Sequence, residues 1–372
     1  MKKVTFLVLS MALATIAFAQ NKSDISDNSG NEFLKKNCGT TEYMKLQIQQ
    51  DPSLSQRLAE HEQEVQRWIM ENKNDVNHSR AIVTIPVVVH IVYSTPMGNL
   101  SDAIVYEQIQ ALNRDYRKLN SDISQIPAAS GWQALAADCE IQFCLAQKTN
   151  SNATTTGIER KQTTINEFSL NDTRMKHANS GGLDQWNKDK YLNIWVCNLP
   201  TNLTGYAISP GQFNSDFGVV INYRYFGITG TYRPLNKGRT AVHEIGHCFG
   251  LMHPWGDDSG ACSGSDNCSD TPNQADMYYG CPAFPKTDNC SPSSPGTMYT
   301  NYMGYVDDSC MVMFTSGQKA IMWANINGTL RNLKTSTACG TSAPTVNFVA
   351  NYPPTVLVGK SIKFFDLSTN NP

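Results

Sequence analysis

The residues best suited to do chemistry lie between positions 243 and 253, which read HEIGHCFGLMH. His243 and His247 are four residues apart, so on a helix both imidazole rings project from one face. Neutral imidazoles bind zinc at about 2.0–2.1 Å and suit a catalytic site that leaves one coordination position for water. Glu244 stands beside the first histidine and can reach such a water without itself being a ligand. The pattern therefore predicts a zinc site with a general base next to it.

Gly250 and His253 extend the pattern past the helix. A glycine can adopt a positive φ and end a helix, after which the chain can turn and bring His253 to the same ion. The alternative is an ordinary helix with surface histidines, because the short pattern HExxH also arises by chance. The two additional fixed positions favour the metal site, with His243, His247 and His253 as zinc ligands and Glu244 as the catalytic base.

The N-terminus predicts export. Residues 1–19 contain two lysines, then an apolar run, then the small-residue sequence AFA, which resembles a bacterial secretory signal peptide cut after Ala19. A membrane anchor is the alternative, but a run of about 15 apolar residues is short for a span, so we expect no membrane association after signal removal. In an exported protein the 11 cysteines meet oxidising conditions, where pairing is the default.

Composition excludes some classes of partner. The chain has 372 residues, a net charge of -2 and 40% hydrophobic residues. The near-neutral charge gives no reason to expect binding to nucleic acid or to an anionic membrane. The length suits two or three domains. The hydrophobic fraction is enough for a sizeable core, which excludes general disorder.

Hydrophobic periodicity predicts a sheet with helices packed on it. Helices are expected at 51–72, 101–120, 239–251 and 315–333, and strands at 84–93, 141–147, 157–162, 191–199 and 218–226. This order predicts a mixed sheet in an α+β domain. Residues 253–299 are rich in Gly, Pro, Ser, Asp and Cys and lack periodicity, so we expect disulfides and bound ions to hold them.

Several segments resemble the metzincin metallopeptidases and, among them, the pappalysin (cytophagalysin) family. NYMGY (301–305) resembles the methionine turn of metzincins, with Met303 as the apolar floor below the zinc, although a single methionine can also be ordinary core packing. Family members often carry an acidic residue where this chain has Gly304. The other segments that resemble the family are 84–93, TGYAISP (204–210), CSDTPNQ (268–274) and VDDSCMVMFTSGQ (306–318), so the resemblance covers roughly residues 80–334.

The resemblance implies a metzincin-like catalytic domain. Its parts would be a sheet-based upper subdomain with a backing helix, the zinc helix, and an irregular lower subdomain tied by disulfides. The implied reaction is zinc-assisted hydrolysis of peptide bonds in protein or peptide substrates, with Glu244 passing a proton from water to the leaving amine. Tyr305 resembles the family's tyrosine that stabilises the tetrahedral oxyanion, and the alternative is a packing aromatic.

Cys38 stands apart from the other ten cysteines, which lie between residues 139 and 339. A thiolate binds zinc well, so Cys38 could fill the position that water needs. Its surroundings, NCGT, resemble the cysteine switch of pappalysin propeptides, which implies that the protein is made as a zymogen. The alternative is a stray or intermolecularly paired thiol. Activation would require cleavage near 75–82, with Arg80 as the expected target.

The resemblance also implies two disulfides in the irregular region. Sequence alone cannot settle pairings. The expected pairs are Cys262 or Cys268 with Cys290, and Cys281 with Cys310.

Acidic residues in the same region suggest two further roles. Hard oxygen ligands suit calcium, and the resemblance favours a structural calcium ion at Asp270 and Asp266 over a simple solvated loop, within a cluster that also contains aspartates at 257 and 258. Asp307 and Asp308 follow the methionine turn, where the wall of the primed-side specificity pocket is expected. A carboxylate there would favour Lys or Arg after the scissile bond, and would make Ser79–Arg80 a self-processing site.

These assignments give an expected domain order. It comprises a signal peptide (1–19), a small helical propeptide with the cysteine switch (20–80), a metzincin-type catalytic domain (81–334), a linker (335–344) and the start of a PKD-like domain (345–372). The last segment resembles an immunoglobulin-like sandwich but is too short to close one. The expected function is that of a secreted zinc endopeptidase. The alternatives are a zinc hydrolase with a non-peptide substrate and an inactive adhesion or binding protein, against which the intact Glu244 argues.

Overall fold

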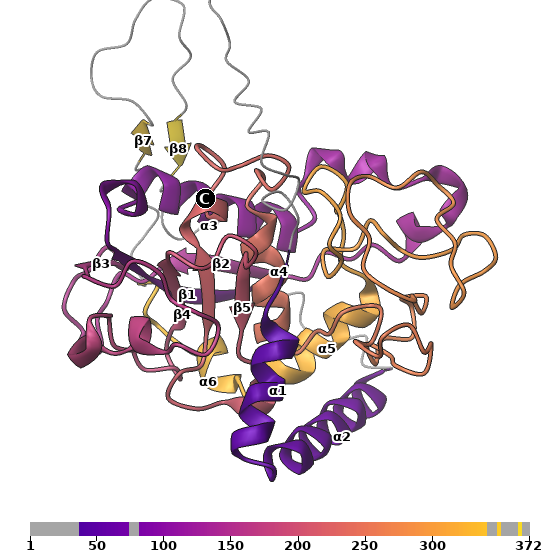
Figure 1. Ribbon diagram of the computed structural model, residues 1–372, viewed down its shortest axis with the longest axis horizontal. Coiled ribbons are helices and arrows are strands. Elements are labelled where there is room, and N and C mark those ends of the chain that lie inside the picture. The colour runs from indigo at the N-terminus through magenta and orange to yellow at the C-terminus, as the bar shows by residue number, and fades with distance from the viewer. Residues whose placement is uncertain (1–36, 74–81, 341–347, 351–363, 367–372) are drawn as a thin grey trace, which may run out of the picture. The chain divides into compact units, whose positions relative to one another are not determined.

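The fold contains a mixed sheet of six strands, on the left in Figure 1. The computed structural model describes residues 37–73, 82–340, 348–350 and 364–366. The order of the strands is β2–β1–β4–β6–β5, with β3 also beside β1. Their bounds are β1 (Val83–Tyr93), β2 (Ile141–Leu145), β3 (Ile158–Gln162), β4 (Leu192–Cys197), β5 (Gly205–Ala207) and β6 (Val219–Asn222).

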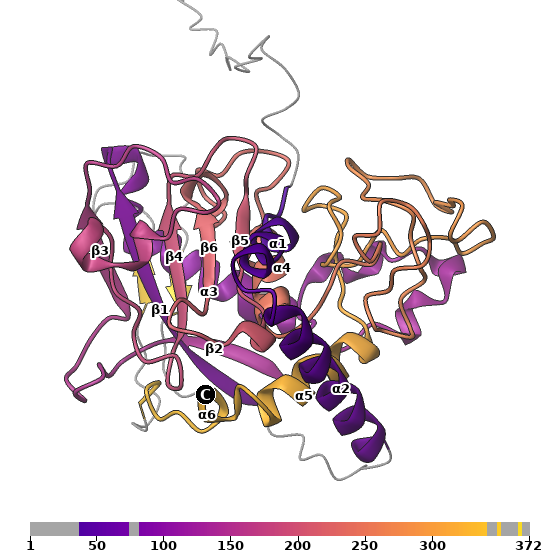
Figure 2. The same cartoon turned by 60° about the horizontal axis from the view of Figure 1, so that its bottom comes forward.

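Within this sheet, all strand pairs except one are parallel. β2 pairs with the first half of β1 and β3 with the second half, while β4 occupies the other edge of β1. β6 continues the parallel sheet, and β5 pairs antiparallel with β6 at the outer edge (Figure 2). The five strands predicted from the sequence are confirmed. The sequence does not predict β5, because Gly-Tyr-Ala carries neither a β-branched run nor a long enough alternation.

Helices cover the sheet and bring the histidine motif to its edge. β1 and β4 are buried along nearly their whole length, as expected of parallel strands with both faces covered. α3 (Asp102–Tyr116) packs against β2, and α4 (Arg239–Cys248) packs against α3, β5 and β6. All ten residues of α4 are buried. The helix that carries the motif is therefore held on several sides by the sheet and its neighbours.

Two helices precede the sheet in the chain. α1 (Thr40–Gln50) contacts β5, and α2 (Leu54–Asn72) packs on α5 (Ser316–Asn327), which α6 (Arg331–Lys334) follows. The sequence predicts α2 and α5 but not α1, whose apolar residues are few and poorly segregated. Short 3-10 turns occur at Pro96–Gly98, Ser121–Gln125, Ala128–Ser130, Trp132–Ala134, Arg174–Lys176, Ala178–Ser180, Pro210–Gln212 and Tyr223–Tyr225.

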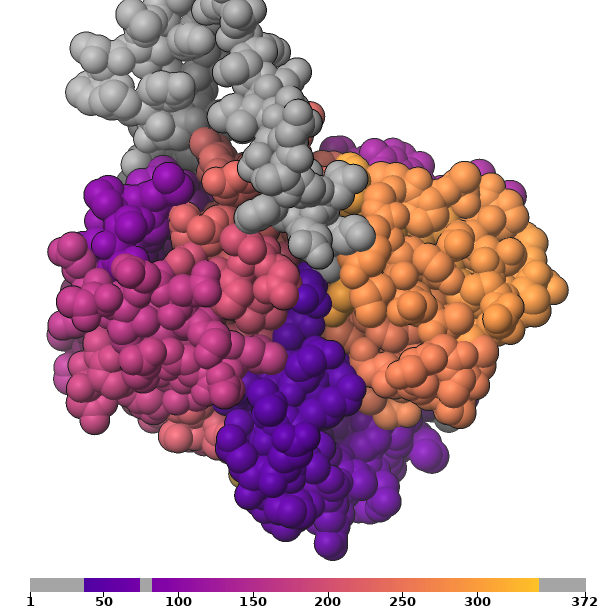
Figure 3. Space-filling model, viewed as in Figure 1, coloured from indigo at the N-terminus to yellow at the C-terminus, as the bar shows by residue number. Residues whose placement is uncertain are grey.

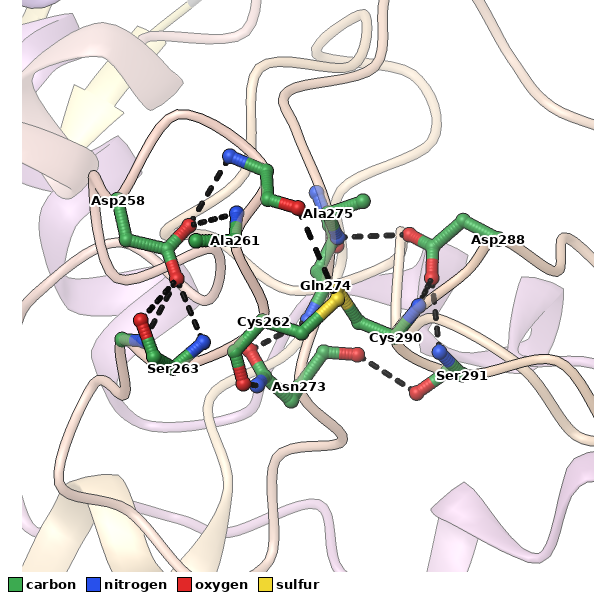
Figure 4. The surroundings of a disulfide bond; sticks show 12 residues. Asp258, Ala261, Cys262, Ser263, Asn273, Gln274, Ala275, Asp288, Cys290 and Ser291 are labelled. Atoms are coloured by element: carbon green, nitrogen blue, oxygen red, sulfur yellow. Dashed lines mark hydrogen bonds between the residues drawn. A yellow bond between two sulfur atoms is a disulfide. The ribbon is translucent and has the colours of Figure 1, made fainter.

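Residues 249–315 contain no helix or strand, so other interactions hold them. Two disulfides, Cys262–Cys290 and Cys281–Cys310, close this region. Figure 4 shows the first of them between two loops that are each gathered around a carboxylate. Asp258 accepts four backbone N–H groups and Asp288 accepts three. These carboxylates and disulfides replace the backbone ladders of regular structure.

Of the two disulfide partners expected for Cys290, Cys262 is confirmed and Cys268 is wrong. Cys290 pairs with Cys262, and Cys268 is a buried free thiol. The Cys268 sulfur lies 3.0 Å from Oδ1 of Asp270, under the start of α5. A Cβ placed on Gly317 would approach this sulfur to 2.6 Å, so the space around it is already filled. The expected pair of Cys281 and Cys310 is confirmed.

Parts of the expected organisation lie outside the described residues. These are the signal peptide, the region around Arg80, part of the linker and most of the PKD-like segment. Within that last segment β7 (Phe348–Ala350) pairs antiparallel with β8 (Phe364–Asp366). A third disulfide joins Cys144 of β2 to Cys339. No helix in the described ranges is long and apolar enough to cross a bilayer.

Candidate metal centre

Three histidine side chains meet at one buried point. His243 and His247 come from α4 and His253 from the chain just after it, and none is more than 3% exposed. Nε2 of His247 lies 3.1 Å from Nε2 of His243 and from Nε2 of His253, and the third pair is 3.3 Å apart. A tetrahedral zinc ion with bonds of about 2.0–2.1 Å separates its nitrogen ligands by about 3.3–3.4 Å. The three predicted ligands are thus brought to a spacing that fits one ion.

The opposite ring nitrogens show which lone pairs face the centre. Nδ1 of His243 and Nδ1 of His247 each donate to a backbone carbonyl at 2.8 Å. Nδ1 of His253 lies 3.0 Å from Oδ2 of Asp257. With protons at Nδ1, the three Nε2 atoms present lone pairs to one another and cannot hydrogen-bond together. A cation is the group that such a donor set fits.

A tight turn after α4 brings in the third histidine. The N–H groups of Gly250 and Leu251 return to the carbonyls of His247 and Gly246, which is the Schellman pattern, and φ of Gly250 is +96°. A Cβ on Gly250 would lie 2.3 Å from Nδ2 of Asn325 on α5. Both the backbone conformation and the available space therefore require glycine, as the sequence predicts.

Met303 lies directly against the motif. It is fully buried, and a Cβ on Gly246, between the two helical histidines, would approach its sulfur to 2.6 Å. The preceding carbonyl, of Tyr302, accepts the hydrogen bond from His243. The backbone N–H of Met303 donates to the Asn301 side chain at 2.9 Å. The segment predicted as a methionine turn thus both supports α4 and orients one histidine.

Cys38 joins the same cluster. One ligand atom from each of Cys38, His243, His247 and His253 lies within 4.8 Å of the others, and in the described part of the chain no other three His, Cys, Asp or Glu residues meet in this way. The Cys38 sulfur is 3.1 Å from Oε2 of Glu244. Burial, and then the charge of Glu244, raises the pKa of the Cys38 thiol well above its usual range. A bound cation is what would favour the thiolate at this position.

Tyr305 holds the backbone of Cys38. Its hydroxyl accepts from the Cys38 N–H and donates to the Cys38 carbonyl, both at 3.1 Å. Its ring packs edge-on against Trp255, whose indole stacks on His253 with centroids 4.3 Å apart. Burial, and then the nearby Cys38 and Glu244 charges, raises the pKa of Tyr305 well above its usual range, so the hydroxyl keeps its proton.

Asp257 orients the third histidine, a role that the sequence reasoning misses. Its carboxylate accepts from His253 and, at 2.8 Å, from the indole N–H of Trp255. Burial alone would raise the pKa of Asp257, but hydrogen bonds from His253 and Thr41 hold it well below its usual range. The spacing of four residues from His253 is the signal that could have found it, because metal-bound imidazoles commonly donate to a carboxylate.

Thr40 and Thr41 are further residues without a sequence signal. The Thr40 hydroxyl donates to Oε2 of Glu244 at 3.2 Å and accepts from the N–H of Ala207 on β5 at 2.9 Å. The Thr41 hydroxyl donates to Asp257 at 2.8 Å. Residues that follow Cys38 therefore contact the predicted base, the edge strand and the carboxylate beside the third histidine.

The segment around Cys38 also pairs with β5 as an added strand. Cys38 forms a parallel bridge with Gly205. The N–H of Gly39 donates to the Gly205 carbonyl, and the N–H of Thr204 donates to the Asn37 carbonyl, both at 2.9 Å. Figure 3 shows the N-terminal helices, in indigo, between residues coloured magenta and the irregular region in orange.

The two expected calcium residues serve as hydrogen-bond acceptors. Asp270 accepts from the Thr315 hydroxyl at 2.6 Å and from the Gly317 N–H at 2.8 Å, at the start of α5. Asp266 accepts from the Thr271 hydroxyl at 2.6 Å, and burial raises its pKa to about 6. Among the described residues, no third His, Cys, Asp or Glu ligand atom joins this pair within 4.8 Å. Calcium binding stays a prediction.

The two candidate specificity residues differ in their surroundings. Asp308 is fully buried, and its Oδ2 accepts from the N–H groups of Lys237 at 2.7 Å and of Arg239 at 3.3 Å, just before and at the start of α4. Asp307 is half-buried, and burial raises its pKa. Asp308 is thus tied to the segment that leads into the histidine helix.

A sheet whose edge carries a buried histidine helix, set on a methionine turn and an irregular disulfide-tied region, points to the metzincin class of metallopeptidases. Within that class the chain belongs to the pappalysin family. Residues 176–327 match the M43 peptidase family model, described as pregnancy-associated plasma protein-A. An extracellular metalloprotease of Pyricularia oryzae is 33% identical over 257 residues, covering 65% of this chain and 75% of the relative.

Solved structures agree with this assignment. Mature mirolysin of Tannerella forsythia in complex with a cleaved peptide is 46% identical with a TM-score of 0.67, covering 68% of this chain and 96% of that one. A promirolysin mutant from the same organism is 42% identical with a TM-score of 0.74, covering 81% of this chain and 97% of that one. The protein is therefore a metallopeptidase, and its family implies a catalytic metal.

Replacing Asp257 with Asn should weaken zinc binding by about 10–100-fold, because the carboxylate that orients His253 and raises its basicity is lost. Competition with a chromogenic chelator on the full chain measures the change. Asp276→Asn alters an exposed aspartate of the same irregular region and serves as the control. Equal zinc affinity for the two variants would contradict the role given to Asp257.

Proposed function

We propose that the protein is a secreted zinc endopeptidase made as a zymogen, with Glu244 as its catalytic base. The observation that carries this proposal is the convergence of three imidazole Nε2 atoms at 3.1–3.3 Å, with a carboxylate and a cysteine beside them. The relatives named as extracellular metalloproteases support secretion. The likeness to promirolysin supports a zymogen.

Glu244 would act on a water molecule that takes the position of the Cys38 sulfur beside the three histidines. When bound by His243, His247 and His253, zinc would supply a Lewis acid that polarises a carbonyl and makes water more acidic. The Cys38 sulfur lies 3.1 Å from Oε2 of Glu244, so a water in its place would be within hydrogen-bond reach of the carboxylate. Glu244 would take the proton of that water during attack and later deliver it to the leaving amine.

Tyr305 would stabilise charge on the carbonyl oxygen under attack. Its hydroxyl now donates to the Cys38 carbonyl, which shows that it can reach a backbone oxygen of a chain lying in the site. A protonated, buried hydroxyl aimed at such an oxygen is suited to the developing negative charge. The same hydroxyl would therefore serve the propeptide and the substrate in turn.

The edge of β5 supports a peptide substrate. Its backbone groups already pair with residues 37–39, and the N–H of Ala207 donates to the Thr40 hydroxyl. An extended peptide can add to such an edge through main-chain hydrogen bonds, independent of its sequence. This feature favours a peptide over a non-peptide substrate.

The propeptide would silence the enzyme at two groups. Cys38 would bind the metal as a thiolate. The Thr40 hydroxyl would hydrogen-bond to Glu244 and to the Ala207 N–H, so neither group would be open to a substrate. Residues 20–80 would thus form the propeptide, and cleavage near Arg80 would let this segment leave.

Glu244→Gln should reduce peptide hydrolysis by about 10²–10⁴-fold while zinc content is unchanged, because the general base is lost and the three ligands remain. Cleavage of a denatured protein by the processed enzyme, together with metal analysis, measures both quantities. Glu167→Gln removes an exposed carboxylate and is the control. Full activity in Glu244→Gln would remove the proposed mechanism.

Thr40→Val should raise the activity of the unprocessed chain about tenfold, because a buried hydroxyl bonded to a carboxylate contributes about 1.5–3 kcal/mol. Thr40→Ser keeps the hydroxyl and should keep the latency, and Cys38→Ser should release more activity than Thr40→Val. Initial rates on a fluorogenic peptide are compared while mass spectrometry shows the chain still intact. A silent Thr40→Val chain whose Cys38→Ser counterpart is active would assign latency to the cysteine alone.

Asp308 would favour a basic residue after the scissile bond through a charge-assisted hydrogen bond. Asp308→Asn should then lower the preference for Arg over Ala at that substrate position by about tenfold, whereas Asp307→Asn should not. The ratio of kcat/KM for two matched peptides measures the preference. If basic residues are not enriched among the products of the unaltered enzyme, this assignment fails.

A further inference from the structure

A tyrosine of α1 fills a pocket beside the edge strand. The ring of Tyr43 stacks on the ring of Tyr206 of β5, with centroids 5.0 Å apart and an interplanar angle of 30°. Tyr43 is only 3% exposed and Tyr206 is fully buried. Because α1 belongs to the proposed propeptide, this contact is lost when the propeptide leaves.

A buried lysine completes the pocket. Nζ of Lys176 lies 5.4 Å from the Tyr206 centroid, 6.0 Å from the Tyr43 centroid and 5.0 Å from the centroid of Trp195 on β4. It donates one hydrogen bond to the Asp216 carbonyl at 2.8 Å. The ammonium group is thus surrounded by three aromatic rings, of which one comes from the propeptide.

The direction of the Tyr206 side chain links this pocket to the substrate. A Cβ on Gly205 would lie 3.0 Å from Cγ of Glu244, so position 205 faces α4, and Tyr206 faces the opposite side of the sheet. In an added strand, the residue opposite Tyr206 places its side chain on the same side as Tyr206. In the propeptide, Cys38 bridges to Gly205 and α1 begins at Thr40, so the ring that stacks on Tyr206 comes from Tyr43 in the first turn of α1.

We propose that the processed enzyme has an aromatic subsite formed by Tyr206 and Lys176, which selects a Tyr, Phe or Trp side chain on the substrate residue opposite Tyr206. The proposal rests on the proposed function. An aromatic side chain there restores both the ring stack and the third ring around the ammonium, which Tyr43 provides in the zymogen. A basic side chain is disfavoured by the positive charge of Lys176, and an aliphatic one lacks the ring.

Cleavage profiling of a peptide library by the processed enzyme tests the preference. Aromatic residues should be enriched at one fixed distance from the scissile bond. Matched peptides with Tyr, Leu or Ala at that position should show kcat/KM about tenfold higher for Tyr than for Ala and about threefold higher than for Leu. Lys176→Met should reduce the ratio of Tyr to Leu towards one while the Ala peptide is still cleaved.

A second measurement avoids altering the buried residues of the enzyme. A synthetic peptide of residues 37–48 should inhibit the unaltered processed enzyme, and Tyr43→Ala in the peptide should raise the inhibition constant about tenfold. Glu42→Ala changes the exposed neighbour and should leave the constant within twofold.

The outcomes separate the two proposals. Cleavage without aromatic enrichment, or inhibition that is equal for the Tyr43→Ala and Glu42→Ala peptides, would overturn the subsite and leave the peptidase function standing. Enrichment of acidic residues at that position would also overturn the subsite, because Lys176 would then select a negative charge and not an aromatic ring. Absence of cleavage of every peptide would remove the proposed function and the subsite with it.

Discussion

Three imidazole lone pairs that face one another inside a buried site are costly unless a cation lies between them, and the surrounding structure is arranged to maintain this configuration. α4 is buried on all sides and holds two of the rings, and the turn at Gly250 delivers the third. Backbone carbonyls and Asp257 hold the outer nitrogens, so the rings cannot rotate without losing hydrogen bonds. Met303 fills the space below α4 and prevents the helix from shifting. Metal binding and the position of α4 are therefore linked.

The proposed propeptide contacts the groups that we propose for substrate binding. Cys38 contacts the Tyr305 hydroxyl through its backbone and Glu244 through its sulfur, while residues 37–40 take the edge of β5. Latency of this kind needs no change in the shape of the enzyme. Each of these proposed inhibitory contacts is a hydrogen bond between buried groups, so it would stabilise the zymogen and leave the site intact when the segment departs.

Much of this arrangement can be predicted from sequence because it rests on short, fixed spacings. The histidine motif, Glu244 and the β-branched strands belong to this group. α1 and the two threonines cannot be found this way, because their positions depend on contacts between residues more than 160 positions apart, such as Thr40 with Ala207. β5 cannot be found because its three residues carry no strand pattern. Cys262 and Cys268 look equivalent in the sequence, and only the packing of Cys268 under α5 distinguishes them. The calcium prediction failed to gain support for a related reason: Asp258 and Asp270 look like free oxygen ligands in the sequence but accept backbone N–H groups in the fold.

The disulfide between Cys144 and Cys339 has a consequence for durability. It encloses residues 145–338, which include the histidine motif, the methionine turn and both other disulfides. A peptidase at high concentration is exposed to its own activity. The long region between α4 and α5 has no helix or strand, so its peptide bonds are more open to cleavage than those of regular structure. A single nick there would leave two fragments joined covalently at β2 as well as by packing, so the nicked molecule would stay in one piece. The disulfide between Cys144 and Cys339 would therefore limit the damage that a single self-cleavage in this region causes.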